Sequence, residues 1–211
     1  MTNSQAFEVE AYKDIDGTPY YFAEWQQGKV YGTGDDAETP DVYLLNFNGY
    51  TKNVEVRKDD RFIALDEKHY SKVVVETKEN GKLKTTTFKT NVHPIYKKRF
   101  MKVVFEGTDF SVIQDYQVRL GTREKQGYAG NQKTQTFNKN ADYYLVKGKK
   151  AKEIKLKKKT IVGLFKDQEA ALKSFVKDSG LKLNNETELV QFLIYYEHLV
   201  HPGSTVAVNE N

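Results

Sequence analysis

The amino-acid sequence predicts an α+β fold, in which an antiparallel β-rich body, a barrel or a sandwich, precedes a small C-terminal helical subdomain. Apolar residues repeat with a period of two up to about Lys159 and with a period near 3.6 after it. The strand-like runs before that point are short, and glycine-containing turns separate them. With 211 residues, the chain is long enough for one sizeable core.

The first half of the body contains several short strand-like runs. Residues 19–31 predict a strand or hairpin that bends at Gln27-Gly28, and the acidic stretch 32–41 predicts a loop. Residues 42–57 predict two strands around Asn48-Gly49, a dipeptide suited to the positive φ angles of a type I′ turn. Further strands are expected at 61–65, 71–77 and 82–90, the last two joined by Asn80-Gly81.

The second half of the body gives the clearest alternation. A strand is expected at 99–106, and 110–120 alternates between an apolar and a polar face. Residues 121–140 are rich in Gly, Gln, Asn and Lys and have no period, which predicts a mobile loop. A last hairpin is expected from 142 to 157 through Gly148.

Helical spacing begins after the last hairpin. Ile161, Leu164 and Phe165 predict a short helix, Asp167 is a candidate cap for a second, and Asn185 is a candidate cap for a third. Pro202 cannot continue a helix. The expected domains are a β-rich body at 1–158, a helical subdomain at 159–201 packed on it, and a frayed tail at 202–211.

Charge and composition narrow the class of protein. Charged residues make up 29% and hydrophobic residues 38%, and no run of about 20 apolar residues predicts a transmembrane segment. No cysteine is present, which excludes disulfides, thiol catalysis and thiolate metal sites. Met1 leads directly into polar residues, so no signal peptide is recognised. This N-terminus fits either a cytoplasmic protein or an added start codon on a mature exported protein.

A lysine-rich hairpin is the strongest candidate binding feature. Residues 147–159 contain eight lysines against Glu153 alone, within a chain of net charge +4. Such lysines can meet an anionic glycan or lipid surface, or they can protect an edge strand from pairing, and we favour edge protection. The candidate binding residues are Lys149, Lys150, Lys152, Lys155, Lys157 and Trp25. For Trp25, the only tryptophan, we favour anchoring in the core over ligand stacking.

No catalytic residue, metal site or cofactor is predicted. His198 and His201 lie three residues apart near a helix end, a spacing that can hold a metal but more often complements the helix dipole. Residues 14–17 resemble the start of a calcium loop but lack its glutamate, and the acidic residues of 35–41 are better explained as a solvated loop. The serines occur without a Gly-x-Ser-x-Gly elbow. A catalytic pair of carboxylates that are distant in the sequence and close only in the folded protein is left open as an alternative.

Both ends of the chain carry short motifs that resemble one family. The motifs are Gly17-Thr18-Pro19-Tyr20, Glu24-Trp25, Gly28-Lys29-Val30, Leu44-Leu45-Asn46-Phe47-Asn48-Gly49-Tyr50, Tyr143-Tyr144-Leu145-Val146, residues 161–165, Phe175-Val176-Lys177 and Leu181-Lys182-Leu183. They are similar to those of an uncharacterised family of exported proteins from Bacteroidetes-type Gram-negative bacteria. The resemblance implies a periplasmic or outer-membrane-associated location and supplies no activity. The stretch 32–41 is longer than the usual turn of that family.

Two functions from different classes follow. The first is a non-catalytic envelope or secreted module that binds a protein partner or a glycan, for example as an accessory subunit of an outer-membrane complex. The second is a hydrolase that acts on a glycan or peptide through carboxylates. A nucleic acid partner is disfavoured because aromatic residues do not alternate with the lysines of 147–159. A cleft with converging carboxylates or histidines would favour the enzyme, and a shallow surface with exposed aromatics would favour binding.

Overall fold

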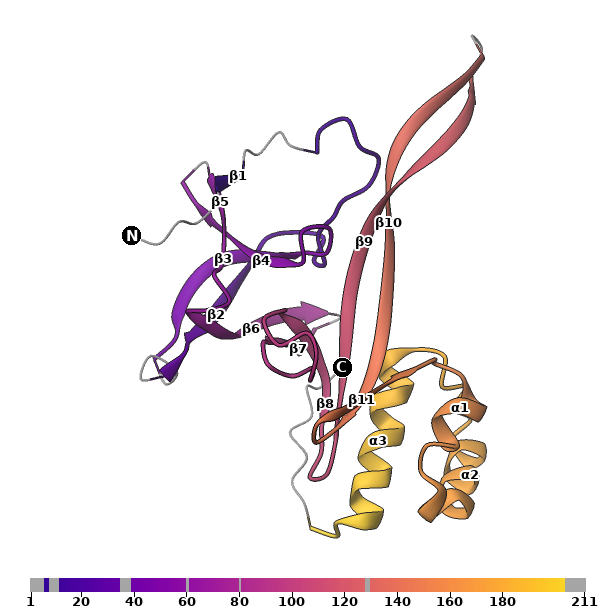
Figure 1. Ribbon diagram of the computed structural model, residues 1–211. Helices are drawn as coiled ribbons and strands as arrows, with labels where there is room; N and C mark the ends of the chain where they lie inside the picture. Colours follow the sequence, from indigo (N-terminus) through magenta and orange to yellow (C-terminus); the bar gives the residue numbers. More distant parts are fainter. Residues whose placement is uncertain are drawn as a thin grey trace.

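The computed structural model describes residues 6–7, 12–34, 39–59, 61–79, 81–127 and 130–203. Within these residues, eleven strands form one antiparallel sheet in the order β1-β5-β4-β3-β2-β6-β7-β8-β9-β10-β11 (Figure 1). Their bounds are β1 Ala6–Phe7, β2 Gln26–Gly32, β3 Asp41–Asn48, β4 Asn53–Lys58, β5 Arg61–Ala64, β6 Tyr70–Glu79, β7 Lys82–Lys89, β8 Met101–Glu106, β9 Ser111–Gly127, β10 Gly130–Lys147 and β11 Lys150–Ile154.

The predicted β-rich α+β class is confirmed, and both a closed barrel and a two-sheet sandwich are wrong. Strands β1 and β11 stand at opposite ends of the hydrogen-bonded order, so the sheet stays open. A second sheet is not needed, because helices cover the apolar face near β8, β9 and β11. Near β2, β3 and β6, the half-buried rings of Tyr21 and Phe22 pack against a second cluster.

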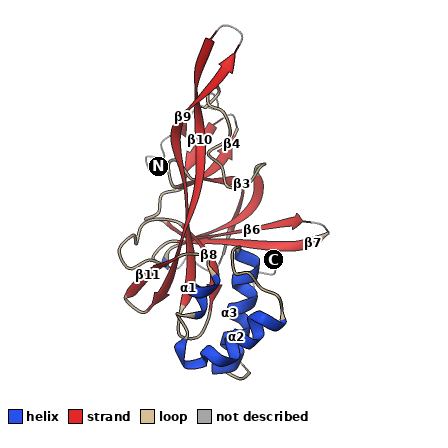
Figure 2. Ribbon diagram, turned by 90° about the vertical axis from the view of Figure 1, so that its right-hand side faces the viewer, coloured by secondary structure: helices blue, strands red, loops and turns tan. Residues whose placement is uncertain are grey.

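The helices lie together at the end of the molecule next to β8 and β11 (Figure 2). Their bounds are α1 Lys158–Val162, η2 Lys166–Gln168, α2 Glu169–Asp178 and α3 Glu186–Val200. Asn185 caps α3 as predicted, since its side-chain oxygen accepts the Glu188 N–H at 2.9 Å. Asp167 does not cap α2: it lies inside η2 and accepts the Tyr196 hydroxyl.

One hydrophobic cluster joins the helices to the sheet. Phe105, Val112 and Ile154 of the sheet are buried with the apolar stripes of the helices, among them Leu172 and Phe192. The polar edge of this contact is the buried Lys102 of β8, which pairs with Glu186 at the start of α3 and donates to the Tyr21 hydroxyl at 2.8 Å. The helices therefore share a core with the body.

Two turns differ from their expected form. The β3–β4 hairpin forms around residues 49–52, but the positive φ belongs to Lys52 (62°) and not to the Asn48-Gly49 pair. Strand β2 runs straight through Gln27-Gly28, where a bend was expected. Gly28 is needed there for space, because a Cβ atom would lie 2.7 Å from Leu45.

The largest departure is at 121–140, where a mobile loop was expected. Except for 128 and 129, which lie outside the described residues, they belong to β9 and β10, which pair continuously from Ser111↔Val146 to Gly127↔Gly130 and project far from the body (Figures 1 and 2). We call the projecting part, residues 120–127 and 130–137, the arm. Most of its side chains whose burial is described are exposed, so no apolar alternation marks them in the sequence.

Candidate functional site

The connection between β7 and β8, residues 90–100, is built around a buried histidine. His93 is 3% exposed, and its Nδ1 accepts the N–H groups of Ile95 and Tyr96, both at 3.2 Å. Its ring stacks on Tyr96 and meets the edge of Tyr144 of β10. An accepting Nδ1 requires neutral imidazole, and burial lowers the pKa of His93 accordingly, against the opposing effect of Asp115.

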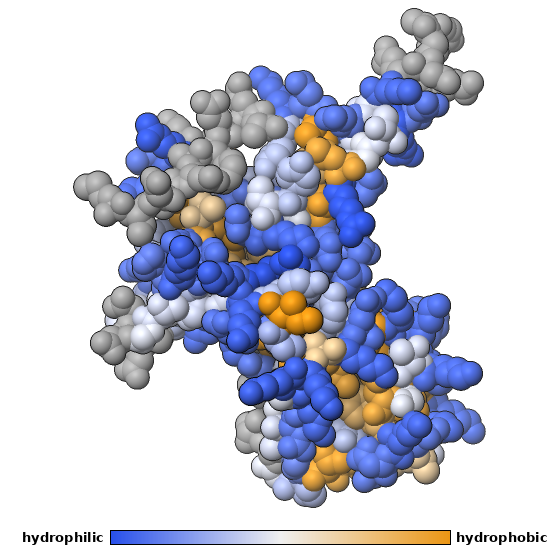
Figure 3. Space-filling view, viewed as in Figure 1, coloured by the Kyte–Doolittle hydropathy of each residue, from blue (hydrophilic) through white to orange (hydrophobic). Residues whose placement is uncertain are grey.

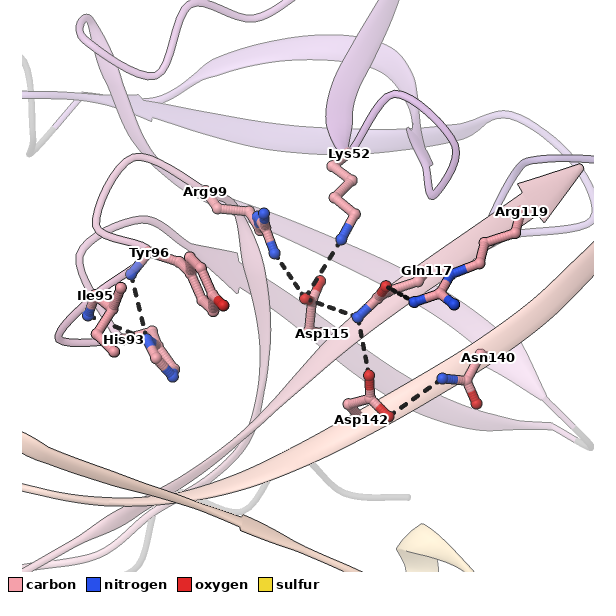
Figure 4. Close-up of polar contacts among 10 residues, drawn as sticks. All are labelled: Lys52, His93, Ile95, Tyr96, Arg99, Asp115, Gln117, Arg119, Asn140 and Asp142. Carbon is pink, nitrogen blue, oxygen red and sulfur yellow. Dashed lines mark hydrogen bonds and ion pairs between the residues drawn. The ribbon is translucent and has the colours of Figure 1, made fainter.

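A buried carboxylate fixes the other end of this loop. Asp115 of β9 is 2% exposed, and its Oδ2 accepts Arg99 Nη1 at 2.8 Å and lies 3.5 Å from Lys52 Nζ (Figure 4). The Gln117 amide also donates to Oδ2, at 3.1 Å, and it continues to Asp142 at 2.9 Å. One carboxylate thus holds two cations, from the β7–β8 loop and from the β3–β4 turn.

The same arrangement changes the titration of Lys52. Burial lowers the pKa of Lys52, Asp115 opposes this, and the neighbouring Arg99 acts in the same direction as burial. Asp115 Oδ1 is buried without a hydrogen-bond partner among the described residues. Both cations therefore share Oδ2, while the second oxygen of the carboxylate keeps unused acceptor capacity.

A shallow, open hollow of about 590 Å³ lies between the β7–β8 loop and the β3–β4 turn. It is lined by Thr51, Lys52, Asn53, Glu67, Ile95, Tyr96, Lys97, Lys98 and Arg99. Ile95 is 77% exposed, and Tyr96, Lys97 and Lys98 are also exposed. We call this the basic hollow, since four of its side chains are cationic and one, Glu67, is acidic.

The arm is the second surface feature. No other described strand pairs with 121–127 or 130–134, so both edges of this ribbon present unpaired backbone groups. From the pair Leu120↔Phe137 to the end of the ladder is seven residues, about 24 Å at the rise of an antiparallel strand. The facing Glu124 and Lys133 are both exposed, 4.0 Å apart.

The base of the arm is packed against the N-terminal part of the chain. Asp16 donates its N–H to the Gln135 carbonyl and accepts from the Phe137 N–H, both at 2.9 Å. The Phe137 ring meets Tyr12 and Tyr50 edge-on, with centroids 5.4 and 5.7 Å away. In Figure 3 apolar groups gather near this base, whereas the visible surface beyond is mainly hydrophilic.

The predicted lysines lie together at one edge of the sheet but form no cavity. Lys149, Lys150 and Lys152 are exposed on the β10–β11 hairpin, which turns at Gly148 as expected. Lys155 and Lys157 are exposed as well, but they follow β11 instead of forming one face of it. Lys155 pairs with Glu153. Because β11 ends the strand order, this placement fits edge protection.

Trp25 is half-buried among other aromatic rings. It stacks on Phe62 of β5, with centroids 4.5 Å apart, and lies 5.3 Å from Tyr20. One face of the indole is therefore occupied by the protein. This contact fits the anchoring interpretation of Trp25.

The two candidate histidines of α3 do not converge. His198 is exposed, and His201 pairs with Asp109 at 3.0 Å. The neighbouring Glu197 is 1% exposed and accepts the Thr108 N–H at 2.7 Å, so it ties α3 to the β8–β9 turn. The part of the chain that the structure describes contains no group of three acidic or histidine side chains placed to hold a metal. Of the expected acidic loop, residues 35–38 lie outside the described residues.

A second hollow, of about 630 Å³, includes Asp41, Asp66 and His69 in its lining. Asp66 accepts the Lys68 N–H at 2.9 Å and meets His69 Nδ1 at 3.1 Å. The Lys68 hydrogen bond holds the pKa of Asp66 below its ordinary value. A general acid at neutral pH needs a raised pKa, so the shift of Asp66 does not fit that role, and both of its contacts lie within the turn at residues 66–69.

Sequence reasoning missed both the basic hollow and the arm. Lys97, Lys98 and Arg99 directly follow the exposed Ile95-Tyr96 pair, so a basic run beside apolar residues was a usable signal for the hollow. The carboxylate that organises it, Asp115, carries no such signal, because only strand pairing brings it near Arg99.

No protein-family model, curated protein or solved structure matches this chain. No helix of the described residues is long and apolar enough to cross a membrane. The resemblance to an exported Bacteroidetes-type family therefore stays a prediction from the motifs.

Proposed function

We propose that this protein is a non-catalytic binding module of the cell envelope, and that its arm docks on a protein partner. The single observation that carries this proposal is the arm itself, a two-stranded ribbon with both edges unpaired over 121–127 and 130–134. An isolated two-stranded ribbon is only marginally stable in water, and its open edges are templates for pairing with another chain.

A protein partner explains the arm better than a glycan does. Exposed backbone N–H and C=O groups along an extended strand match another strand, which is the basis of β-augmentation. Sugar binding usually needs a free aromatic face, and the side chains described in the arm are mostly polar, with Phe137 buried at its base.

The periplasmic or outer-membrane-associated location is part of the proposal and rests on the family-like motifs at 17–30, 44–50 and 143–183. Fractionation of the native producer tests it, with the protein detected by an antibody. We expect the protein in the periplasm or with the outer membrane. Recovery with the cytoplasm would contradict it.

Shortening the arm tests the docking proposal. Residues 123–134 are replaced by Asn-Gly, which joins the facing Thr122 and Gln135 through a two-residue turn. The matched control shortens the β6–β7 hairpin in the same way, replacing 77–84 between the facing Glu76 and Thr85. Both variants should keep the circular dichroism and cooperative melting of the parent.

The readout is stoichiometric co-purification from detergent-solubilised envelope. We expect one protein to co-purify with the parent and with the control, and to be lost with the shortened arm. If the same protein is retained by both variants, or if only a glycan co-purifies, the docking proposal fails.

A further inference from the structure

The basic hollow has an excess of positive charge that the protein does not compensate. Lys52, Lys97, Lys98 and Arg99 supply four cations, whereas Glu67 and the buried Asp115 supply two carboxylates. Lys97 and Lys98 are exposed and make no ion pair within the described residues. A ligand that carries carboxylates would complete this arrangement.

The Arg99 guanidinium is preorganised to bind such a carboxylate. Its guanidinium has five N–H groups, and Nη1 alone donates to Asp115 among the described residues. The side chain is partly exposed and lines the hollow. Because Asp115 and the Tyr96 ring, whose centroid lies 4.4 Å away, already fix the guanidinium, little conformational entropy is lost when it binds.

The apolar part of the hollow indicates which class of anionic ligand it fits. Ile95 is 77% exposed beside the lysines, a position that favours contact with an apolar side chain. His93 stacks on the Tyr96 ring at 4.7 Å, and Arg99 lies over the same ring (Figure 4). Two groups this close to the ring centre occupy its two faces, so Tyr96 offers no free face for a sugar.

We propose that the basic hollow binds a short acidic peptide segment of a partner protein, with carboxylates on Lys97, Lys98 and Arg99 and an apolar side chain on Ile95. Charge complementarity selects this occupant, and Ile95 separates it from inorganic anions. The proposal goes beyond docking by the arm and does not depend on it.

The test measures binding of a fluorescein-labelled peptide that alternates glutamate and leucine, by anisotropy. In the K97E/K98E variant, two surface attractions are lost and replaced by repulsion, so we expect affinity to fall by about tenfold or more. The K166E/K177E variant makes the same charge change on exposed lysines of the helical region, and we expect little effect. Ile95→Ser should lower the affinity for the peptide by about threefold to tenfold, because an apolar contact is lost.

Competitors identify the ligand class. A peptide with glutamine in place of glutamate, inorganic phosphate and a sulfated octasaccharide should each compete poorly. Equal weakening by K97E/K98E and K166E/K177E would show that only the net charge of the protein matters, and this would overturn the proposal. Absence of peptide binding, or stronger competition by phosphate or octasaccharide, would overturn it as well. The arm-shortened variant should bind the peptide normally, which separates this test from that of the arm.

Discussion

At the residue scale, buried polar side chains determine the shape of the β7–β8 loop. His93 accepts two backbone N–H groups that no strand or helix partner satisfies, and Asp115 of strand β9 anchors Arg99. Sequence alone did not identify either role. A histidine after an irregular stretch and an aspartate in an alternating strand are common, and only their burial gives them these partners.

Acidification should loosen the β7–β8 loop through His93. The pKa of His93 in the folded protein lies below the ordinary 6.5, so below pH 6.5 the unfolded chain binds the proton first. Stability contributed by neutral His93 is therefore full above that value and falls as the pH drops towards the lowered folded pKa. Thermal melts between pH 7.5 and pH 5 measure this loss.

The control for this effect is His93→Asn, which keeps an acceptor near the position of Nδ1 and does not titrate. Its melting temperature should depend less on pH than that of the parent. His93→Ala should cost about 1–3 kcal/mol at neutral pH, because two backbone donors lose their acceptor. Identical pH profiles for the parent and His93→Asn would contradict the assignment.

At the element scale, the sequence pattern predicted the β10–β11 hairpin but not the arm. Apolar alternation up to Leu120 predicted a strand, and β9 extends beyond it to Gly127. Pairing with β10 continues there because the facing backbones satisfy each other, although no core lies beneath. The hairpin through Gly148 was predicted because its turn residue and its buried Val146 and Ile154 both leave a signal.

The lysines of β11 should keep the edge of the sheet from pairing with other molecules. We expect Lys150→Thr with Lys152→Thr to promote self-association, since threonine favours strands and two repelling charges are lost. Light scattering after size-exclusion chromatography over a dilution series measures this. Lys166→Thr with Lys177→Thr removes the same charge from exposed positions in the helical region and should leave the protein monodisperse.

A binding role for the same lysines makes a different prediction. It requires association with anionic vesicles that weakens steeply with salt and is lost on Lys155→Glu with Lys157→Glu. That outcome, together with no self-association of the threonine variant, would show that these lysines bind an anionic surface and do not protect the edge of the sheet.

At the scale of the whole molecule, the helices complete the core of the sheet. Val104, Phe105, Phe110, Val112 and Ile154 of the sheet side are buried in the same cluster as the helical stripes. The short helices are too short to be stable alone, so their stability also comes from this contact. The expected domains, a β-rich body at 1–158, a helical subdomain at 159–201 packed on it and a frayed tail at 202–211, stay a prediction, and residues 204–211 lie outside the described residues.

Truncation before Thr160 tests that division. Removal of the helices exposes the apolar residues of β8, β9 and β11 and leaves Lys102 without Glu186, so we expect an aggregating product without a cooperative melt. Glu186→Gln in the full chain is the milder comparison and should cost about 1–3 kcal/mol while the fold persists. A soluble fragment ending at Lys159 with unchanged stability would show that the helices are a separate module.

The sequence by itself determined the fold class, most strands before Lys159 and the helices after it, because burial on one face imposes a period that can be read directly. The open sheet, the arm and the basic hollow were decided by the tertiary structure. Strand order depends on pairings between distant segments, and most of the described side chains of the arm are exposed. The hollow lies between two segments whose Arg99 and Lys52 both contact Asp115 of a third. None of these long-range contacts leaves a local pattern.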